Sequence, residues 1–237
     1  MVRLFLLKFA PYLLWGIFYF NALNTDAQQP IKQLVPGSFD STYYIDFSTG
    51  KIFPKEFSKQ VLIALSYFPE LKNMHIKFRL SETHTPLSTT PTFISCFKRK
   101  GKRKFVISIS TKTSEKLSPI LFINLPYNAQ VGVLGHELSH VSDLSQKNFF
   151  GLIRIGIGHL SKRFMDNFEN NTDMICIKHG LGYQLLEWSK YVRTALQIED
   201  WYGANNPESF HKSSSRRERY LSPSSIQHQL DQLPLYR

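Results

Sequence analysis

One stretch near the middle of the chain constrains the fold most. From Gln130 to Val141 the residues are apolar or uncharged, except for Glu137. A helix on a protein surface presents charged side chains to water, so this pattern predicts a helix that is buried. His136 and His140 are four residues apart and would share one face of that helix.

Two buried imidazoles and a carboxylate need polar partners, and a metal ion supplies them. The segment from His136 to His140 has the H-E-x-x-H pattern, with which a helix presents two histidines to one zinc ion. Neutral imidazoles suit zinc, which lies ~2.0–2.1 Å from ligating nitrogens. Glu137 lies one step around the helix, where it could reach a water on the metal without being a ligand. The alternative is a core helix whose histidines are hydrogen-bonded and hold no metal.

A catalytic zinc site needs a third protein ligand. The position six residues after His140 is Gln146, which excludes a short-spaced third histidine. Asp143 shares the face of the histidines but lies ~10 Å along the axis from His136, so we interpret it as a cap or as a residue that supports a ligand. Glu169 is the better candidate.

Helical spacing around Glu169 predicts a second helix, and Gly180 and Gly182 are plausible stop signals for it. Asp173 is four residues after Glu169, on the same face. Glu169 could therefore reach the metal while Asp173 accepts a hydrogen bond from the far nitrogen of a ligating histidine. The alternative is that the two acids form an ordinary polar stripe.

The phrase from Phe168 through Asp173 to Gly180, following H-E-x-x-H, resembles the gluzincin metallopeptidases, and among them the CAAX-prenyl-protease and HtpX-like branch. The resemblance covers residues 130–182. It departs from that branch in two respects: the branch usually has several membrane spans, and it often has alanine where this chain has Thr172.

The resemblance implies that His136, His140 and Glu169 bind Zn²⁺, that Glu137 is the general base and that Asp173 supports a ligand. The expected activity is hydrolysis of a peptide bond in a protein or peptide substrate by a zinc-bound water. The alternative function is a non-catalytic, zinc-stabilised envelope protein that binds a partner or an anionic lipid surface and has no use for Glu137.

Hydrolysis also needs a donor for the oxyanion. In the related families that donor comes from beyond the ligand helix, which favours His211 or Tyr220. Further candidates are His159, His179 and Tyr202.

The length of 237 residues and a hydrophobic content of 42% favour one folded domain, over residues 28–237. We expect a zincin-like α+β fold, with a small mixed sheet beside the active-site helix and then a mostly helical C-terminal half. Predicted helices span residues 54–67 and 183–198, with a short one near 226–230 opened by Ser222 and Pro223. Predicted strands span residues 74–80, 105–110 and 120–123. Residues 105–111 are the predicted sheet edge for an extended peptide.

Residues 1–27 resemble a signal peptide, with Arg3 before an apolar run and the small residue Ala27 at its end. Pro11 interrupts the run, which is short for a bilayer-spanning helix; an uncleaved N-terminal anchor is the alternative. The expected location is therefore outside the cytoplasm: the periplasm, the cell envelope or the medium.

The chain has a formal net charge of +11, and residues 98–104 hold six basic side chains around Gly101. We interpret this run as a solvated hairpin tip. Nucleic acid is an unlikely partner, and anionic membrane lipids or acidic envelope polymers fit the charge better. The apolar residues 148–158 are expected to form a loop or short helix that packs on the core; a lid and a contact with a membrane surface are the alternatives. Cys96 and Cys176 are expected to be separate buried thiols, although an exported chain could pair them.

Overall fold

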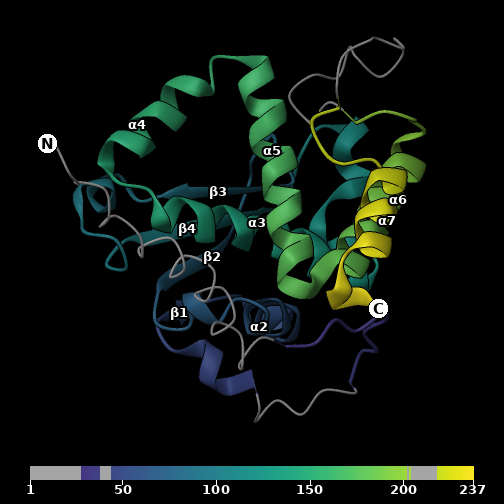
Figure 1. Ribbon diagram of the computed structural model, residues 1–237, viewed down its shortest axis with the longest axis horizontal. Helices are drawn as coiled ribbons and strands as arrows, with labels where there is room; N and C mark the ends of the chain where they lie inside the picture. Colours follow the sequence, from purple (N-terminus) through teal and green to yellow (C-terminus); the bar gives the residue numbers. More distant parts are fainter. Residues whose placement is uncertain (1–27, 38–43, 202, 204–217) are drawn as a thin grey trace, which may run out of the picture.

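The structure, a computed structural model, describes residues 28–37, 44–201, 203 and 218–237. The predicted leader, residues 1–27, lies outside these ranges, as do Tyr202 and His211. The described chain is α+β, with a small mixed sheet in its N-terminal half and a mostly helical C-terminal half (Figure 1). None of the helices in these ranges has the length and apolar character needed to cross a bilayer.

Within the described residues, four strands form the sheet, in the order β1-β2-β4-β3. Their bounds are Lys51–Ile52 for β1, His75–Ser81 for β2, Leu87–Pro91 for β3 and Lys104–Ser110 for β4. β1, β2 and β4 run parallel, and β3 runs antiparallel to β4. The predicted strands 74–80 and 105–110 are confirmed as β2 and β4.

The predicted sheet edge is wrong. β4 lies between β2 and β3 and is paired on both sides, so residues 105–110 have no free edge for a peptide. The outer strand beside β4 is β3, which the sequence did not predict. Its residues Leu87–Pro91 are mainly Ser and Thr, with no apolar alternation, and pairing with β4 is what makes them a strand.

The predicted strand at residues 120–123 is also wrong. Ile120 ends one 3₁₀ turn, η5 (Glu115–Ile120), Phe122 and Ile123 lie in the next, η6 (Phe122–Asn124), and Leu121 lies between the two. Ile120 and Phe122 are buried, so the apolar run serves the core without joining the sheet. A short apolar run flanked by Pro119 and Pro126 fits a packed turn as well as a strand, and the pattern alone does not separate the two.

The α-helices of the described chain are α2 (Ser58–Ser66), α3 (Tyr127–Gln146), α4 (Phe149–Gly158), α5 (Lys162–Cys176), α6 (Gly182–Leu196) and α7 (Pro223–Gln232). Shorter helical turns are η1 (Ile45–Ser48), η2 (Lys55–Phe57), η3 (Pro69–Leu71), η4 (Phe93–Phe97), η7 (Ile177–Leu181) and η9 (Pro234–Tyr236). The helices predicted at 54–67, 183–198 and 226–230 are confirmed as η2 with α2, α6 and α7. Ser222 caps α7 by accepting a hydrogen bond from the Ser225 amide, as its position before Pro223 predicts.

α3 is the buried helix that the uncharged segment predicts. It packs against α2, α5, α6 and β3, which places it between the sheet and the C-terminal helices (Figure 1). Gly132 lets α3 and α6 approach closely, because a Cβ there would lie 2.2 Å from the Gln184 carbonyl oxygen. The contact fixes α6, and Trp188 on it, against the helix that carries both histidines.

Arg103 corrects the prediction that the basic run is entirely solvated. Its side chain is 2% exposed, and its Nη1 donates hydrogen bonds to the carbonyl oxygens of Leu144 (3.0 Å) and Lys147 (2.6 Å). These carbonyls belong to the C-terminal end of α3, where a cation interacts favourably with the helix dipole. The other basic residues of the run are exposed.

The ends of α5 differ in part from the prediction. Gly180 interrupts the helix with φ of 97°, a conformation that favours glycine. Gly182 does not stop α5; it is the first residue of α6. The predicted loop or helix at 148–158 is helix α4, capped by Asn148. The expected packing on the core holds only for Leu152 and Ile155, and no residue of α4 is buried. Cys96 and Cys176 are both free; Cys176 is buried and Cys96 is partly exposed.

Candidate metal centre

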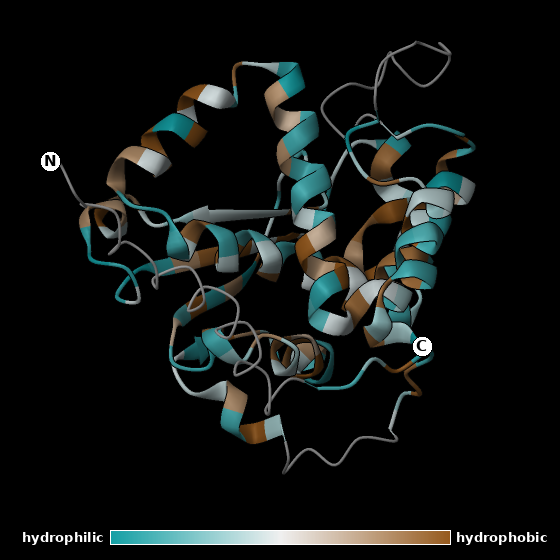
Figure 2. Cartoon of the chain, viewed as in Figure 1, coloured by the Kyte–Doolittle hydropathy of each residue, from teal (hydrophilic) through white to brown (hydrophobic). Residues whose placement is uncertain are grey.

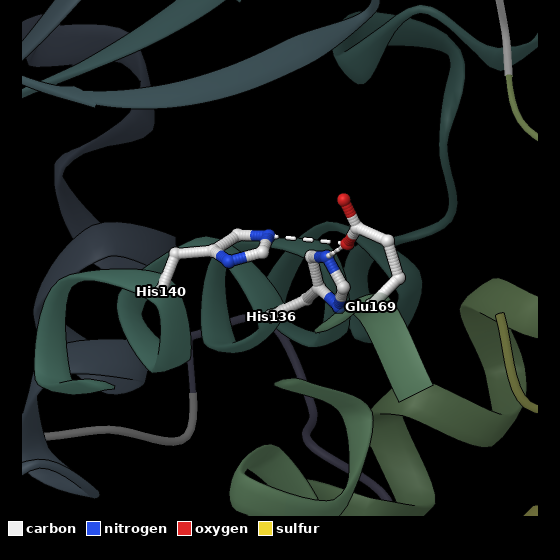
Figure 3. Close-up of side chains that lie close together, drawn as sticks. All are labelled: His136, His140 and Glu169. Carbon is white, nitrogen blue, oxygen red and sulfur yellow. Dashed lines mark hydrogen bonds and ion pairs between the residues drawn. The ribbon is translucent and has the colours of Figure 1, made fainter. Parts of the chain in front are cut away.

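The two histidines of α3 face one oxygen of Glu169 on α5. His136 Nε2 lies 3.1 Å from Glu169 Oε2, and His140 Nε2 lies 3.2 Å from the same atom (Figure 3). All three side chains are buried, with residue exposures of 2%, 8% and 7%. The candidate ligand atoms lie within 4.8 Å of one another, so residues 33 positions apart in the chain form one cluster that could hold a metal ion.

The spacing suits a small cation with tetrahedral coordination. Ligand atoms ~2.0–2.1 Å from zinc at tetrahedral angles lie ~3.3 Å apart, close to the two distances observed from Glu169 Oε2. Two imidazole nitrogens and a carboxylate oxygen are also a donor set that zinc accepts.

Asp173 holds His136 in the orientation that such a site needs. The Nδ1 of His136 lies 2.8 Å from Asp173 Oδ1, so the imidazole donates there and its Nε2 faces Glu169. The second oxygen of Asp173 accepts a hydrogen bond of 2.7 Å from the Leu221 amide. This hydrogen bond to a histidine is the contact that the sequence predicts for Asp173; its role beside a metal ion stays a prediction.

Thr172 does the same for His140. Its hydroxyl donates to the Phe168 carbonyl (2.9 Å), which leaves the oxygen free to accept from His140 Nδ1, 3.2 Å away. The hydroxyl therefore favours the tautomer of His140 that directs an unprotonated Nε2 toward Glu169. In the sequence, Thr172 is notable only because the branch that the chain resembles often has alanine there. In the structure, this threonine contacts His140.

The electrostatics of the cluster favour a cation. Burial lowers the pKa of His136, but its hydrogen bonds with Asp173 and Glu169 outweigh burial and raise that pKa well above its ordinary value. Burial raises the pKa of Glu169, but attraction to His140 and His136 lowers it far below its ordinary range. The site thus stabilises positive charge at its centre, the charge that a bound metal ion would carry.

Glu137 points to the same region from the adjacent position on α3. Its Oε2 accepts a 2.6 Å hydrogen bond from the hydroxyl of Thr89 on β3. Glu137 itself is 6% exposed and lines a cavity shared with His136 and His140. The carboxylate is therefore held next to the candidate ligands without being one of them.

Aromatic rings enclose the cluster. Phe168 stacks on His140, with ring centroids 5.0 Å apart, and Trp188 and Tyr220 contact His136 at 5.6 Å and 5.5 Å. Burial, and then the charges of Glu169 and Glu137, raise the pKa of Tyr220 well above its ordinary value. Tyr220 therefore keeps its hydroxyl proton at neutral pH and can donate it in a hydrogen bond.

The cavity beside the cluster has a volume of about 500 Å³. β3 forms one side with residues such as Thr89, α4 contributes Leu152 and Ile155, and Tyr220 closes another side. This volume lies within the usual range for ligand pockets, ~300–1,000 Å³. The cluster thus faces a space that could admit a side chain or a short peptide segment.

Three predicted participants lie elsewhere or play other parts. Asp143 forms an ion pair with Lys147 (2.8 Å) and neither caps α3 nor supports a ligand, so that interpretation is wrong. His179 stacks on Phe68 and pairs with Glu70, away from the cluster. His159 lines the cavity, but its Nδ1 contacts the Ile155 carbonyl at 2.7 Å.

The sequence predicts the three candidate ligands, Glu137, Asp173 and Tyr220 as members of the site, but it predicts neither Thr89 nor the contact of Thr172. For Thr172 a signal was present, since a hydroxyl residue adjoins the supporting aspartate. For Thr89 there was none, because its strand is recognisable only in the folded sheet.

Comparison of the chain with protein-family models, with curated proteins and with solved structures finds no match. The chemistry of the buried His136, His140 and Glu169 cluster is therefore what indicates a function.

Proposed function

We propose that the protein is a zinc-dependent metallopeptidase of the gluzincin type, with His136, His140 and Glu169 as zinc ligands. The observation that carries the proposal is the convergence of both Nε2 atoms on Glu169 Oε2, beside a cavity and a fourth side chain, Glu137. Three protein ligands leave one tetrahedral position open, which is typical of catalytic rather than structural zinc sites.

A zinc ion held by these ligands would supply a Lewis acid and lower the pKa of a coordinated water toward neutrality. Glu137 is placed to accept a proton from the attacking water and to pass it to the leaving nitrogen as the peptide C–N bond breaks. The hydroxyl of Thr89 orients the carboxylate through its 2.6 Å hydrogen bond.

Tyr220 is the preferred oxyanion donor. It lines the cavity beside His136, and its raised pKa keeps the hydroxyl protonated. His159 also lines the cavity, but the proton that its Nδ1 donates to Ile155 leaves its Nε2 an acceptor in the neutral ring.

An extended substrate would lie along β3. This strand borders the cavity and is the outer strand of the sheet beside β4, so its outward backbone groups could pair with a peptide. The same arrangement, an outer strand alongside a metal-binding helix in an α+β chain, supports a zincin-like fold. A leader at residues 1–27 would make the enzyme an exported one.

Glu137→Gln tests the proposal against a non-catalytic, zinc-stabilised protein. We expect the variant to keep its zinc, because Glu137 is no ligand, and to lose at least about a hundredfold in the rate of hydrolysis. The assay is cleavage of an unfolded protein and of a mixed peptide library, followed by mass spectrometry, with zinc content measured on the same samples. Glu187→Gln, at an exposed site on α6, is the matched control. Equal cleavage by Glu137→Gln and wild type would contradict the proposal.

A further inference from the structure

The most unusual surface of the described chain is apolar and lies beside the cavity. In η4, Phe93, Ile94 and Phe97 are exposed, at 82%, 74% and 66%. In α4, Phe150 and Ile157 are exposed at 77% and 65%. Phe97 contacts Phe149 with ring centroids 5.2 Å apart, so η4 and α4 present one continuous surface. We call it the η4–α4 surface; it also includes Ile153 and Leu160.

α4 is apolar on two sides. Leu152 and Ile155 face the cavity, whereas Ile153 and Ile157 face outward. Figure 2 shows hydrophobic segments along α4, which lies at the periphery of the molecule. A helix with apolar residues all round is ordinarily buried in a core or in a membrane. The core covers only the inner side of α4. The apolar residues on its outer side are therefore exposed, although such residues are ordinarily buried.

Every charged residue in the two sequence segments that contain η4 and α4, residues 83–114 and 144–165, is basic. Exposed basic residues follow η4, lie within α4 and begin α5: Lys98, Arg99, Lys100, Lys102, Arg154, Lys162 and Arg163. The sequence contains no Asp or Glu from residue 83 to 114, nor from 144 to 165. Aromatic and aliphatic side chains with a basic surround and no acids are the composition of a segment that lies in the interface of an anionic bilayer.

We propose that the η4–α4 surface docks on a membrane that contains anionic lipids. Phe93, Phe97 and Phe150 enter the boundary between headgroups and acyl chains, and the surrounding lysines and arginines contact lipid phosphates. Because Leu152 and Ile155 line the cavity from the other side of α4, docking holds the candidate metal centre one helix away from the bilayer surface. The proposal does not depend on hydrolysis.

The test is flotation of the full chain with vesicles of phosphatidylcholine alone and of phosphatidylcholine with 30% phosphatidylglycerol. Phe150→Ser with Ile157→Ser removes two exposed apolar side chains, and Ile52→Ser with Ile123→Ser is the matched control, since those residues are each 63% exposed elsewhere. We expect the η4–α4 variant to lose at least about tenfold in partition onto anionic vesicles, and the control to bind as the wild type does. All variants retain residues 1–27, so binding is measured as partition coefficients over a titration of lipid, and a contribution common to all variants cancels in their ratios.

A second pair tests the charges. Lys98→Gln with Lys100→Gln should weaken binding to anionic vesicles by about fivefold per lysine, and 1 M salt should abolish the difference because the Debye length falls to about 3 Å. Lys55→Gln with Lys59→Gln makes the same change in net charge at exposed positions near α2 and should have little effect.

Three results would overturn the proposal. The wild type could fail to float with anionic vesicles, or Phe150→Ser with Ile157→Ser could float as well as the wild type does. Alternatively, sedimentation velocity could show that this variant dissociates an oligomer while wild type ignores the vesicles, which would assign the surface to a second copy of the chain. Far-UV circular dichroism verifies that each variant is folded. If Phe150→Ser with Ile157→Ser does not fold, the variant Lys98→Gln with Lys100→Gln tests the proposal instead.

Discussion

Two threonines contact side chains of the candidate site, one on His140 and one on Glu137. Thr172 contacts His140 Nδ1, on the side of the imidazole away from Glu169. Thr89 contacts the carboxylate of Glu137 from the sheet. Under the proposed function, Thr172 would support metal affinity and Thr89 would support proton transfer, so replacing each threonine by valine should separate the two experimentally.

Thr172→Val removes the acceptor of the His140 Nδ1 proton while keeping the shape of the side chain. We expect about a tenfold loss of zinc affinity, because partners of this kind typically contribute ten- to a hundredfold. Competition with a chromophoric chelator measures the affinity. Thr89→Val is the comparison: it should leave zinc affinity unchanged and lower the hydrolytic rate. Unaltered zinc binding by Thr172→Val would show that the contact does not support the ligand.

At the scale of elements, the site depends on how closely α3 approaches its neighbours. Gly132 permits the contact with α6, where the atoms nearest an added Cβ are backbone atoms of Gln184 and Leu185. Backbone atoms cannot rotate away as a flexible side chain can. The helix that carries both histidines is thus positioned by a glycine that lies outside the motif.

Gly132→Ala should destabilise the protein by about 1–3 kcal/mol or more, because the added methyl group has no room. Gly156→Ala is the control in α4, where no atom lies within 4 Å of the added Cβ. That substitution should be neutral or stabilising by about 0.5–1 kcal/mol, since alanine favours a helix interior over glycine. Urea unfolding compares the two, and equal stabilities would argue against the close contact between α3 and α6.

A second inter-element contact gives a pH dependence. Glu70 on η3 accepts hydrogen bonds from Ser142 on α3 (2.6 Å) and from His179 on η7 (3.1 Å). Burial raises the pKa of Glu70 and lowers that of His179, but their mutual hydrogen bond and attraction outweigh burial. The pKa of Glu70 is therefore lowered from 4.5, and that of His179 is raised from 6.5.

The raised pKa of His179 contributes stability that is complete below pH 6.5 and is lost as the pH rises through the folded-state pKa. The lowered pKa of Glu70 contributes stability that is complete above pH 4.5 and is lost as the pH falls through its folded-state pKa. Both contributions coincide between pH 4.5 and 6.5.

His179→Gln should therefore lower the free energy of unfolding more at pH 6 than at pH 8.5. The difference should not exceed about 1 kcal/mol, because both side chains are partly exposed. Urea denaturation at the two pH values measures it, with the exposed His84→Gln as control. A loss of stability that is the same at both pH values would mean that the ion pair contributes nothing.

For the whole molecule, the sequence predicts what depends on local pattern. The segment from Gln130 to Val141 predicts a buried helix because a buried helix has few charged residues, and this segment has only Glu137. Glu169 and Asp173 are recognisable because four-residue spacing puts them on one face. The alternating apolar residues of β2 and β4 predict two strands ahead of the helical segments, and so an α+β chain.

What the sequence missed depends on contacts between distant residues. β3 has no pattern of its own and exists through pairing with β4, so Thr89 and the true sheet edge could not be foreseen. Arg103 belongs by sequence to a basic run, yet it is buried because the C-terminal end of α3 offers it two carbonyls. The apolar side chains of residues 120–122 pack in the core from 3₁₀ turns and the residue between them. A short apolar run of this kind does not distinguish a packed turn from a strand.

The proposed activity requires one metal ion bound between α3 and α5. The most direct test is the zinc content of the purified protein by elemental analysis, for the wild type beside Glu169→Gln and the control Glu187→Gln. We predict one zinc per chain in the wild type and the control, and a strong loss in Glu169→Gln, whose amide is a poor substitute for a carboxylate ligand. A wild type without zinc after metal-replete expression, or a Glu169→Gln variant that keeps all of it, would contradict the account.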